Sequence, residues 1–471
     1  MSPESDHDAN LLRPRSLLRG QITYSTARED GNNILHQLGY RDERDQYFTH
    51  LFQNRQLIKK IIGRRLGLSS DSCHLVDVED WIHGSFNVCI RADIDTFKPG
   101  NSDEKIRCEA GTYAWLQENC PNVPIPHLYG FGLSNGETFT HLEHMTFLTR
   151  IVQYLRRHVL RWLGYSIPTS YIPYQMNEAK PLGNEYILIE YIDSSRGQML
   201  LQSWGKGSGN LTLSNRLLTL QLQLLENEHI PVDIPRQITH ATADSYIHDL
   251  LAFHESRFRH QPNAVSSLQD GFYQACALSV IRSVWPFFSR RDLLRGPFFM
   301  ELTDLHPSNI MVDEDWNIKS LIDLEWACSR PVEMIHPPDW LAGEPGPEMD
   351  LEAYEITHGE FVEILREEEE KNSLAQQPVV QLHSIMKDGW GRGTFWCSIA
   401  LNMPMALFEI FYTHIQPRFS KSHKDDESFW LITMPYWTFG TFKFLEKKLR
   451  DKEQYDQRLH EAFFDRKTEC L

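Results

Sequence analysis

Three oxygen-bearing side chains stand at fixed spacings next to short apolar runs. Asp304 and Asn309 follow the run 298–302, and Asp323 follows a second run that ends at Ile322. Phosphoryl transfer from ATP needs a carboxylate that orients and deprotonates the acceptor hydroxyl, and oxygen ligands for the Mg²⁺ on the phosphates. The pattern therefore indicates Asp304 as the base, and Asn309 and Asp323 as magnesium ligands.

Two other interpretations of these residues remain open. Asp and Asn are common in turns, and either aspartate alone would be interpreted as a turn residue. A metal-dependent hydrolase using Asp304, His306 and Asp323 is a remote alternative, because no HxxxH or HxD pattern accompanies them. We interpret His306 as structural, bonding the backbone to hold the loop rather than acting as a second base.

The strands and helices that must position these residues can be predicted from the pattern of apolar residues along the chain. Continuous apolar runs predict strands, and apolar residues recurring every three to four positions predict helices. Strands are expected over 186–192, 298–302, 310–312 and 318–322, with a turn at 313–317 and a β-hairpin between 74–78 and 87–90. Helices are expected over 41–66, 102–118, 145–163 and 264–288, and the chain beyond 345 is expected to be helical.

The segments LTDLHPSNI (302–310) and IDLEW (322–326) carry a family resemblance. They resemble the aminoglycoside phosphotransferase and choline kinase group of the protein-kinase-like superfamily, especially its fungal members. The resemblance continues in WIHGSFNV (81–88), PGNSDEK (99–105), CEAGTYAW (108–115) and HPPDWL (336–341), so that it spans about residues 40–465. These motifs are typical of the superfamily and say little about the acceptor.

The resemblance implies an α+β fold of the bilobal, protein-kinase-like type. A small β-rich N-lobe would precede a larger, mainly helical C-lobe. On this basis we expect an N-lobe with added helices over 39–190, and a C-lobe with the catalytic loop and C-terminal helices over 191–471. Residues 1–38 are polar and show little periodicity, so we expect a mobile N-terminal arm or a loosely docked one there.

The same resemblance implies a nucleotide site in the N-lobe. The backbone from Glu190 to Ile192 would read adenine, and Glu109 would hold the basic residue that binds the phosphates. Without the resemblance, Glu109 would be interpreted as a surface helix residue. Backbone N–H groups of a hairpin tip would lie over the phosphates; the tip residues are Gly84, Ser85, Phe86 and Asn87.

The chain departs from the family where the basic residue belongs. The family carries a further strand of alternating apolar residues with that residue, and here Ile90 leads almost directly to Lys98 and Pro99. Arg91 is the nearest substitute at a strand end. Losing such a charge contact costs several kcal/mol in comparable sites. The alternative function is therefore a catalytically impaired pseudokinase or nucleotide-binding scaffold, and the missing strand is either real or the result of missing gene segments.

Composition limits the partners. The 471 residues are 41% hydrophobic and carry 47 basic and 64 acidic side chains, for a net charge of −17. This balance gives no general attraction to nucleic acid or to anionic membranes, and it permits a cationic small-molecule acceptor. None of the eight cysteines forms a C-x-x-C pair, and the sequence contains no run of 18 apolar residues. Because the residues after Met1 are polar, we expect no secretory leader. We therefore expect a cytoplasmic enzyme with free thiols.

Overall fold

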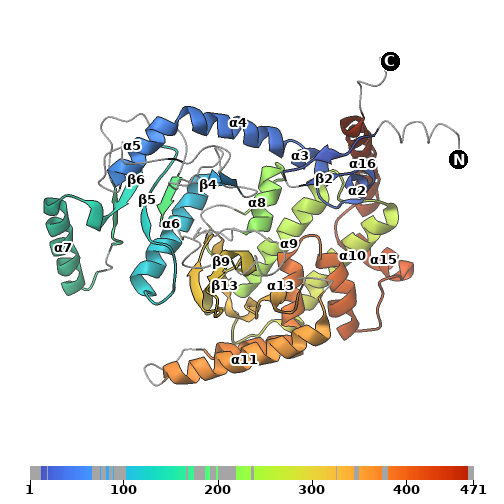
Figure 1. Cartoon of the computed structure of the whole chain (residues 1–471). Coiled ribbons are helices and arrows are strands. Elements are labelled where there is room, and N and C mark those ends of the chain that lie inside the picture. The colour runs from blue at the N-terminus through green and yellow to red at the C-terminus, as the bar shows by residue number, and fades with distance from the viewer. Residues whose placement is uncertain are drawn as a thin grey trace, which may run out of the picture. The chain divides into compact units, whose positions relative to one another are not determined.

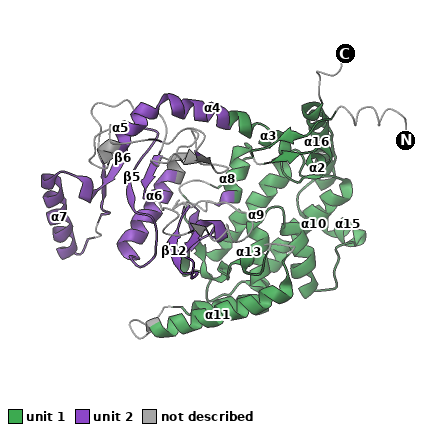
Figure 2. Cartoon of the chain, in the orientation of Figure 1, with its two compact units in different colours: residues 1–43, 221–299, 330–471 green, residues 44–220, 300–329 purple. Residues whose placement is uncertain are grey.

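The computed structural model describes residues 12–18, 20–65, 75, 81–83, 88–89, 102–165, 168–173, 186–190, 198–199, 219–234, 238–324, 326–343, 349–373 and 380–464. These residues form helices and small sheets, which confirms the expected α+β class. The chain divides into two compact units (Figure 2). Unit 1 comprises residues 1–43, 221–299 and 330–471, and unit 2 comprises residues 44–220 and 300–329.

These units differ from the division expected at residue 190. Residues 300–329, which include Asp304, Asn309 and Asp323, group with residues 44–220 rather than with the remaining C-terminal part of the chain. All three side chains with predicted chemistry therefore belong to unit 2.

Unit 2 is built around two sheets and a short hairpin (Figure 1). Its helices are α4 (Tyr40–Gln53, from Arg44 onward), α5 (Arg55–Arg65), α6 (Ser102–Asn119) and α7 (Phe147–Trp162). Its strands are β3 (Ile82–His83), β4 (Val88–Cys89), β5 (Leu128–Gly132), β6 (Thr138–His141), β7 (Tyr171–Pro173), β8 (Tyr186–Ile189), β9 (Gln198–Met199), β11 (Ile310–Val312) and β12 (Ile318–Leu321). β10 (Phe298–Leu302) and β13 (Ala327–Pro331) pair with each other and cross the unit boundary in sequence.

The larger sheet of unit 2 has the strand order β7–β6–β5–β8, and its neighbours are antiparallel. Leu128, Gly130 and Gly132 are the buried positions of β5 and alternate with half-buried ones, as expected for a strand with one covered face. A Cβ at Gly130 would stand 2.6 Å from the carbonyl oxygen of Phe139, so the close approach of β5 and β6 requires glycine there. α6 packs against β5 and β8.

Helices α4 and α5 pack on β8 through a hydrophobic cluster. The buried members of the cluster are Leu51, Ile58, Ile61, Ile62, Trp81, Tyr186 and Leu188.

The single helix expected over 41–66 is divided into these two helices at Asn54, whose Nδ2 donates to the carbonyl of His50 at 2.9 Å. The side chain of an asparagine competes in this way with regular helix bonding.

The predicted β-hairpin is present, with its strands closer to the tip than expected. Ile82 pairs with Cys89 and His83 pairs with Val88 in an antiparallel ladder. The tip at 84–87 and the expected first strand, apart from Leu75, lie outside the described residues.

Unit 1 is mainly helical (Figure 1). It contains β1 (Arg15–Ser16), β2 (Gln21–Ile22), α2 (Tyr24–Glu29), α3 (Ile34–Gln37), α8 (Leu220–Asn227, from Gln221 onward), α9 (Ala243–His260), α10 (Leu268–Phe288), α11 (Leu351–Ser373), α12 (Leu382–Arg392), α13 (Thr394–Asn402), α14 (Leu407–Ile410), α15 (Glu427–Thr433) and α16 (Thr441–Phe463). The predicted helices over 264–288 and in the C-terminal region are confirmed. No described helix is long and apolar enough to cross a membrane.

Of the mobile and the docked arm expected for residues 1–38, the structure shows a docked one for residues 12–18 and 20–38. Arg15 Nε donates to the carbonyl of Ala462 at 2.6 Å, and the N–H of Ile34 donates to the hydroxyl of Tyr455 at 2.9 Å. Apolar side chains of both segments also share a core, which contains Ile22, Ala27, Ile34, Tyr455, Leu459 and Phe463. The arm therefore packs along α16 and is part of unit 1.

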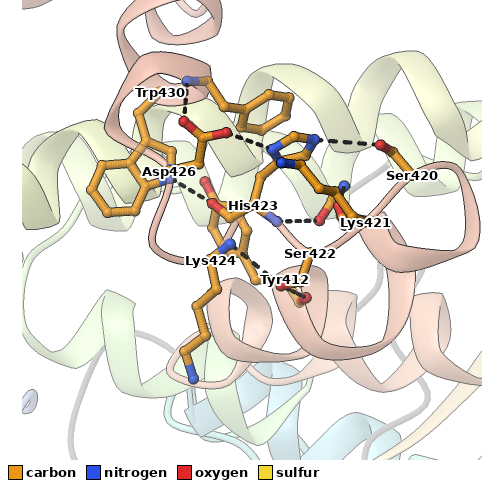
Figure 3. A network of polar contacts seen from close by, with 10 residues as sticks. Tyr412, Ser420, Lys421, Ser422, His423, Lys424, Asp426 and Trp430 are labelled. Atoms are coloured by element: carbon orange, nitrogen blue, oxygen red, sulfur yellow. Dashed lines mark hydrogen bonds and ion pairs between the residues drawn. The ribbon is translucent and has the colours of Figure 1, made fainter.

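A polar network around His423 fixes the loop between α14 and α15 (Figure 3). The N–H of His423 donates to Gln416 Oε1 at 2.9 Å, and its carbonyl accepts from Trp430 Nε1 at 3.2 Å. The His423 ring lies 2.9 Å from the Asp426 carboxylate, which also caps α15 through the N–H of Phe429. The contact with His423 lowers the pKa of Asp426. This network has the character of loop structure rather than of a site.

A buried lysine lies on α16. Lys448 is 1% exposed, and its Nζ donates to the carbonyl of Gln261 at 2.5 Å. Burial lowers its pKa to about 8, although Asp451, 3.6 Å from Nζ, opposes the shift. Since the unfolded chain binds this proton more tightly, the cost of burying the charge disappears as the pH rises from about 8 to about 10.5.

We therefore expect the wild type to gain stability relative to Lys448→Met over that pH range. The predicted gain is about 2–3 kcal/mol, because each unit of pKa shift corresponds to about 1.4 kcal/mol. Urea unfolding of both proteins at pH 7.5 to 10 measures this gain. Subtracting the free energy of unfolding of the variant from that of the wild type removes the contribution of groups that titrate in both proteins. If the free energies of unfolding of the two proteins changed in parallel with pH, the lowered pKa of Lys448 would be contradicted.

Candidate functional site

The loop that carries Asp304 begins with a firm anchor. Directly after β10, Thr303 donates twice to the carbonyl of Trp326, from its N–H at 3.2 Å and from its hydroxyl at 2.6 Å. Two bonds to one carbonyl hold the start of the loop against the start of β13. The sequence motifs did not reveal the Trp326 carbonyl as a support, because a backbone acceptor leaves no residue-type signal.

His306 shapes the middle of the loop. Its Nδ1 accepts from the N–H of Ser308 at 3.3 Å and lies 2.7 Å from the Ser308 hydroxyl. The His306 side chain thereby caps the short 3₁₀ turn Pro307–Asn309. An acceptor Nδ1 places the proton of the neutral ring on Nε2. That atom lies 3.8 Å from Asp304 Oδ1. The bond from the backbone N–H of Ser308 fits the predicted structural role of His306. A protonated Nε2 has no lone pair for a metal, which weakens the hydrolase alternative.

Asn309 connects the two halves of the site. It is 3% exposed, and its Nδ2 donates to the carbonyl of Asp304 at 3.1 Å. Its own carbonyl accepts from the N–H of Ile322 at 2.9 Å, one residue before Asp323. The structure therefore brings Asp304 and Asn309 into direct contact and ties Asn309 to the segment that carries Asp323.

Asp323 has a left-handed backbone, with φ of 59°. It follows β12, which pairs with β11 in the sheet β12–β11–β9. All three residues of β11 are buried, so the sheet beneath the loop is anchored by apolar packing. Aspartate tolerates this conformation better than most residues, and such strained positions concentrate at functional sites.

The turn between β11 and β12 is polar, as predicted, and it is stabilised locally. Asp313 accepts from the N–H of Asn317 at 2.8 Å and lies 2.7 Å from Lys319 Nζ. The contact with Lys319 holds the pKa of Asp313 well below its usual range. These exposed residues support the hairpin and lie apart in sequence from the three candidate side chains.

The structure describes two residues of the expected nucleotide site, Glu109 and Glu190. Glu109 is 5% exposed on α6, so its interpretation as a surface helix residue is wrong. Glu190 follows β8; its N–H donates to the carbonyl of His127 at 2.8 Å, and its Oε2 accepts from the His127 N–H at 3.4 Å. Both residues belong to unit 2. The remaining expected residues, Gly84, Ser85, Phe86, Asn87, Arg91 and Ile192, lie outside the described residues.

A histidine cluster on the larger sheet was not predicted from the sequence. His127, His141 and Glu143 each place one possible ligand atom within 4.8 Å of the others, and such donors are typical of zinc sites. However, His127 Nδ1 lies 2.8 Å from Gln117 Nε2, and the His141 ring packs on His127 and Tyr171. His127 is therefore held by a hydrogen bond and His141 by ring packing, while the buried Nδ1 of His141 has no hydrogen-bond partner among the described residues and lies 3.5 Å from Glu143 Oε2.

The chain matches no protein-family model, and no match was found among curated proteins or among solved structures. A function must therefore be inferred from the geometry described above and from the sequence motifs.

The conformation of Asp323 leads to a test of the site. Asp323→Ala is expected to lower the free energy of unfolding by about 1 kcal/mol, because the left-handed region is costly for alanine. Asp323→Asn is expected to retain wild-type stability, since asparagine adopts this region readily. Urea denaturation measures both, with Asp315→Ala on the exposed turn as the control. Equal losses in the two Asp323 variants would show that the backbone there is not strained.

Proposed function

We propose that the chain is an ATP- and Mg²⁺-dependent phosphotransferase of the aminoglycoside phosphotransferase type, with a bilobal kinase-like fold, acting on a small-molecule hydroxyl. The observation that carries this proposal is the pair of bonds made by Asn309. One bond reaches the carbonyl of Asp304 and the other reaches Ile322, so a candidate base and two candidate metal ligands belong to one hydrogen-bonded unit.

The donor set fits magnesium. Mg²⁺ prefers oxygen ligands, and Asn309 and Asp323 supply an amide oxygen and a carboxylate. The Nδ2 end of the Asn309 amide faces the Asp304 carbonyl, so the oxygen end is turned away from it. When bound, Mg²⁺ would neutralise charge on the transferring phosphate.

Asp304 provides the general base in this mechanism. The acceptor hydroxyl gives its proton to the Asp304 carboxylate while its oxygen bonds to the γ-phosphorus of ATP. The bond from that phosphorus to the bridging oxygen breaks, and ADP leaves. His306 Nε2 lies 3.8 Å from Asp304 Oδ1, which is too far for a hydrogen bond. The Asp304 side chain is 15% exposed, and its Oδ2 is buried.

The remaining residues of the proposal bind the nucleotide. The segment Glu190 to Ile192 would contact adenine, the tip 84–87 would cover the phosphates, and Glu109 would orient a basic residue, for which Arg91 is the candidate. The burial of Glu109 supports this role, because a buried carboxylate is normally kept where it holds a partner. The acceptor would be a small and preferably cationic molecule.

Replacing Asp304 by asparagine tests the catalytic assignment. Asp304→Asn keeps the side-chain shape and removes the base, so phosphoryl transfer is expected to fall by at least about 100-fold. The measurement is ADP release from Mg-ATP, alone and with amino sugars or choline as acceptors. Asp315→Asn, on the exposed turn, is the matched control and should keep wild-type turnover. Equal turnover in the wild type and Asp304→Asn would exclude Asp304 as the base.

A nucleotide-binding scaffold is the second candidate, and it is favoured by the absence of the basic strand between Ile90 and Lys98 in the sequence. Thermal unfolding with millimolar Mg-ATP separates the two functions. We expect the phosphotransferase to be stabilised by several degrees, since a ligand well above its Kd stabilises the folded state, and Asp323→Asn should lose most of this shift. A shift without turnover would favour the scaffold, and no shift would oppose ATP binding altogether.

A further inference from the structure

α7 is an amphipathic helix whose apolar side faces solvent. Phe147, Leu148 and Trp162 are 73%, 75% and 85% exposed. Further large exposed side chains of the helix and its C-terminal turn are Ile151, Val152, Tyr154, Leu155, Val159 and Leu163. At roughly 100° per residue, these positions form one stripe about 180° wide. By helical spacing, His158 is the one polar residue of α7 within the stripe. An exposed apolar stripe of this kind marks an interaction surface.

The opposite side of α7 attaches the helix to unit 2. Its less exposed positions include Thr149, Gln153 and Arg157. Arg157 Nη1 donates to Ser170 Oγ at 2.5 Å, and the Ser170 carbonyl accepts from the N–H of Leu142 at 2.9 Å. A surface helix ordinarily packs its apolar stripe on the core. α7 is docked in the reverse sense, through three polar side chains and the apolar Leu160, and Figure 1 shows it standing at the edge of the β-strands around β6.

The helix is well defined at its C-terminal end. Gly164 has φ of 75°, its N–H donates to the carbonyl of Arg161, and the N–H of Tyr165 donates to that of Leu160. This is the Schellman pattern that stops a helix. The 16 residues of α7 span about 24 Å, less than the roughly 30 Å of a bilayer core. The apolar stripe therefore has the length of a helix that lies along a surface.

Positive charge borders the stripe on both sides. α7 contains four arginines and no acidic residue, although the whole chain has a net charge of −17. By helical spacing, Arg150 and Arg161 stand at one edge of the stripe and Arg156 at the other. Arginines in this position keep their guanidinium groups at the level of lipid headgroups while their stems lie along the apolar face.

The charge pattern distinguishes between possible occupants. If a second copy of α7 packed on the stripe, arginine-lined edges would meet arginine-lined edges, and like charges would repel. An anionic bilayer surface instead offers an apolar layer for the stripe and negative headgroups for both edges. Trp162, Tyr154 and Tyr165 supply the aromatic rings that favour this boundary.

We propose that α7 is an interfacial helix that binds the surface of anionic lipid membranes through its exposed stripe and the arginines beside it. This function is independent of the phosphotransferase activity proposed above. It concerns a local patch, whereas the expectation of no membrane partner was based on the charge and hydropathy of the whole chain.

Vesicle sedimentation of the full chain tests the proposal. The wild type is expected to pellet with vesicles of phosphatidylcholine and phosphatidylserine, to bind pure phosphatidylcholine more weakly, and to be released by salt. Leu155→Gln with Trp162→Gln should lower the partition coefficient at least about tenfold, because two buried apolar side chains are lost. Arg150→Gln and Arg156→Gln should each lower binding to the anionic vesicles about fivefold.

Ile364→Gln is the matched control, since Ile364 is an exposed apolar residue on α11. It should bind vesicles like the wild type. All substituted side chains are exposed, and unchanged thermal unfolding would verify that the variants fold. The proposal is overturned if the wild type does not pellet with anionic vesicles, or if the Leu155/Trp162 variant pellets equally well. It is also overturned if α7 mediates self-association of the chain in solution without any lipid binding.

Discussion

The candidate site depends on a backbone connection between two segments that are some distance apart in sequence. Thr303 is bonded to Trp326, and Asn309 is bonded to Ile322. These bonds clamp the loop after β10 onto the segment after β12, so backbone hydrogen bonds help to place Asp304 and Asp323. Since Asn309 is almost fully buried, losing its amide would leave the carbonyl of Asp304 without this donor in a dry environment, which is costly. Residue 309 is therefore as much a structural requirement as a candidate ligand.

Packing below the clamp explains how a loop of polar residues remains ordered. β11 is buried along its whole length, and Ser308 is buried beside Asn309. Pro307 at the start of the 3₁₀ turn restricts the backbone before the chain enters β11. The buried strand β11 thus stabilises the loop, while the residues of the 3₁₀ turn set the path of its backbone. A candidate base on such a loop is held by rigid supports, as catalysis by positioning requires.

The sequence predicted elements whose signal is local and failed where the signal is distant. The strands around Asn309 and the helix at 102–119 follow from apolar runs, a cap and periodicity. The docking of residues 12–38 does not, because its partner is the last helix and the bond from Ile34 to Tyr455 joins residues more than 400 positions apart. Without the family resemblance, the burial of Glu109 would be missed for a similar reason: helix periodicity does not reveal which neighbouring elements cover a polar position.

α7 shows a further limit of sequence patterns. Its periodicity predicted the helix, but periodicity cannot say which face is docked, and here Arg157 docks the polar one. Charge has the same local character. At physiological ionic strength, charges are screened beyond about 8 Å, so a surface that approaches the stripe meets the arginines of α7 rather than the net charge of −17. The net charge of the whole chain therefore opposes the approach of an anionic surface only weakly at long range. At short range, the residues of α7 that contact the surface determine the interaction.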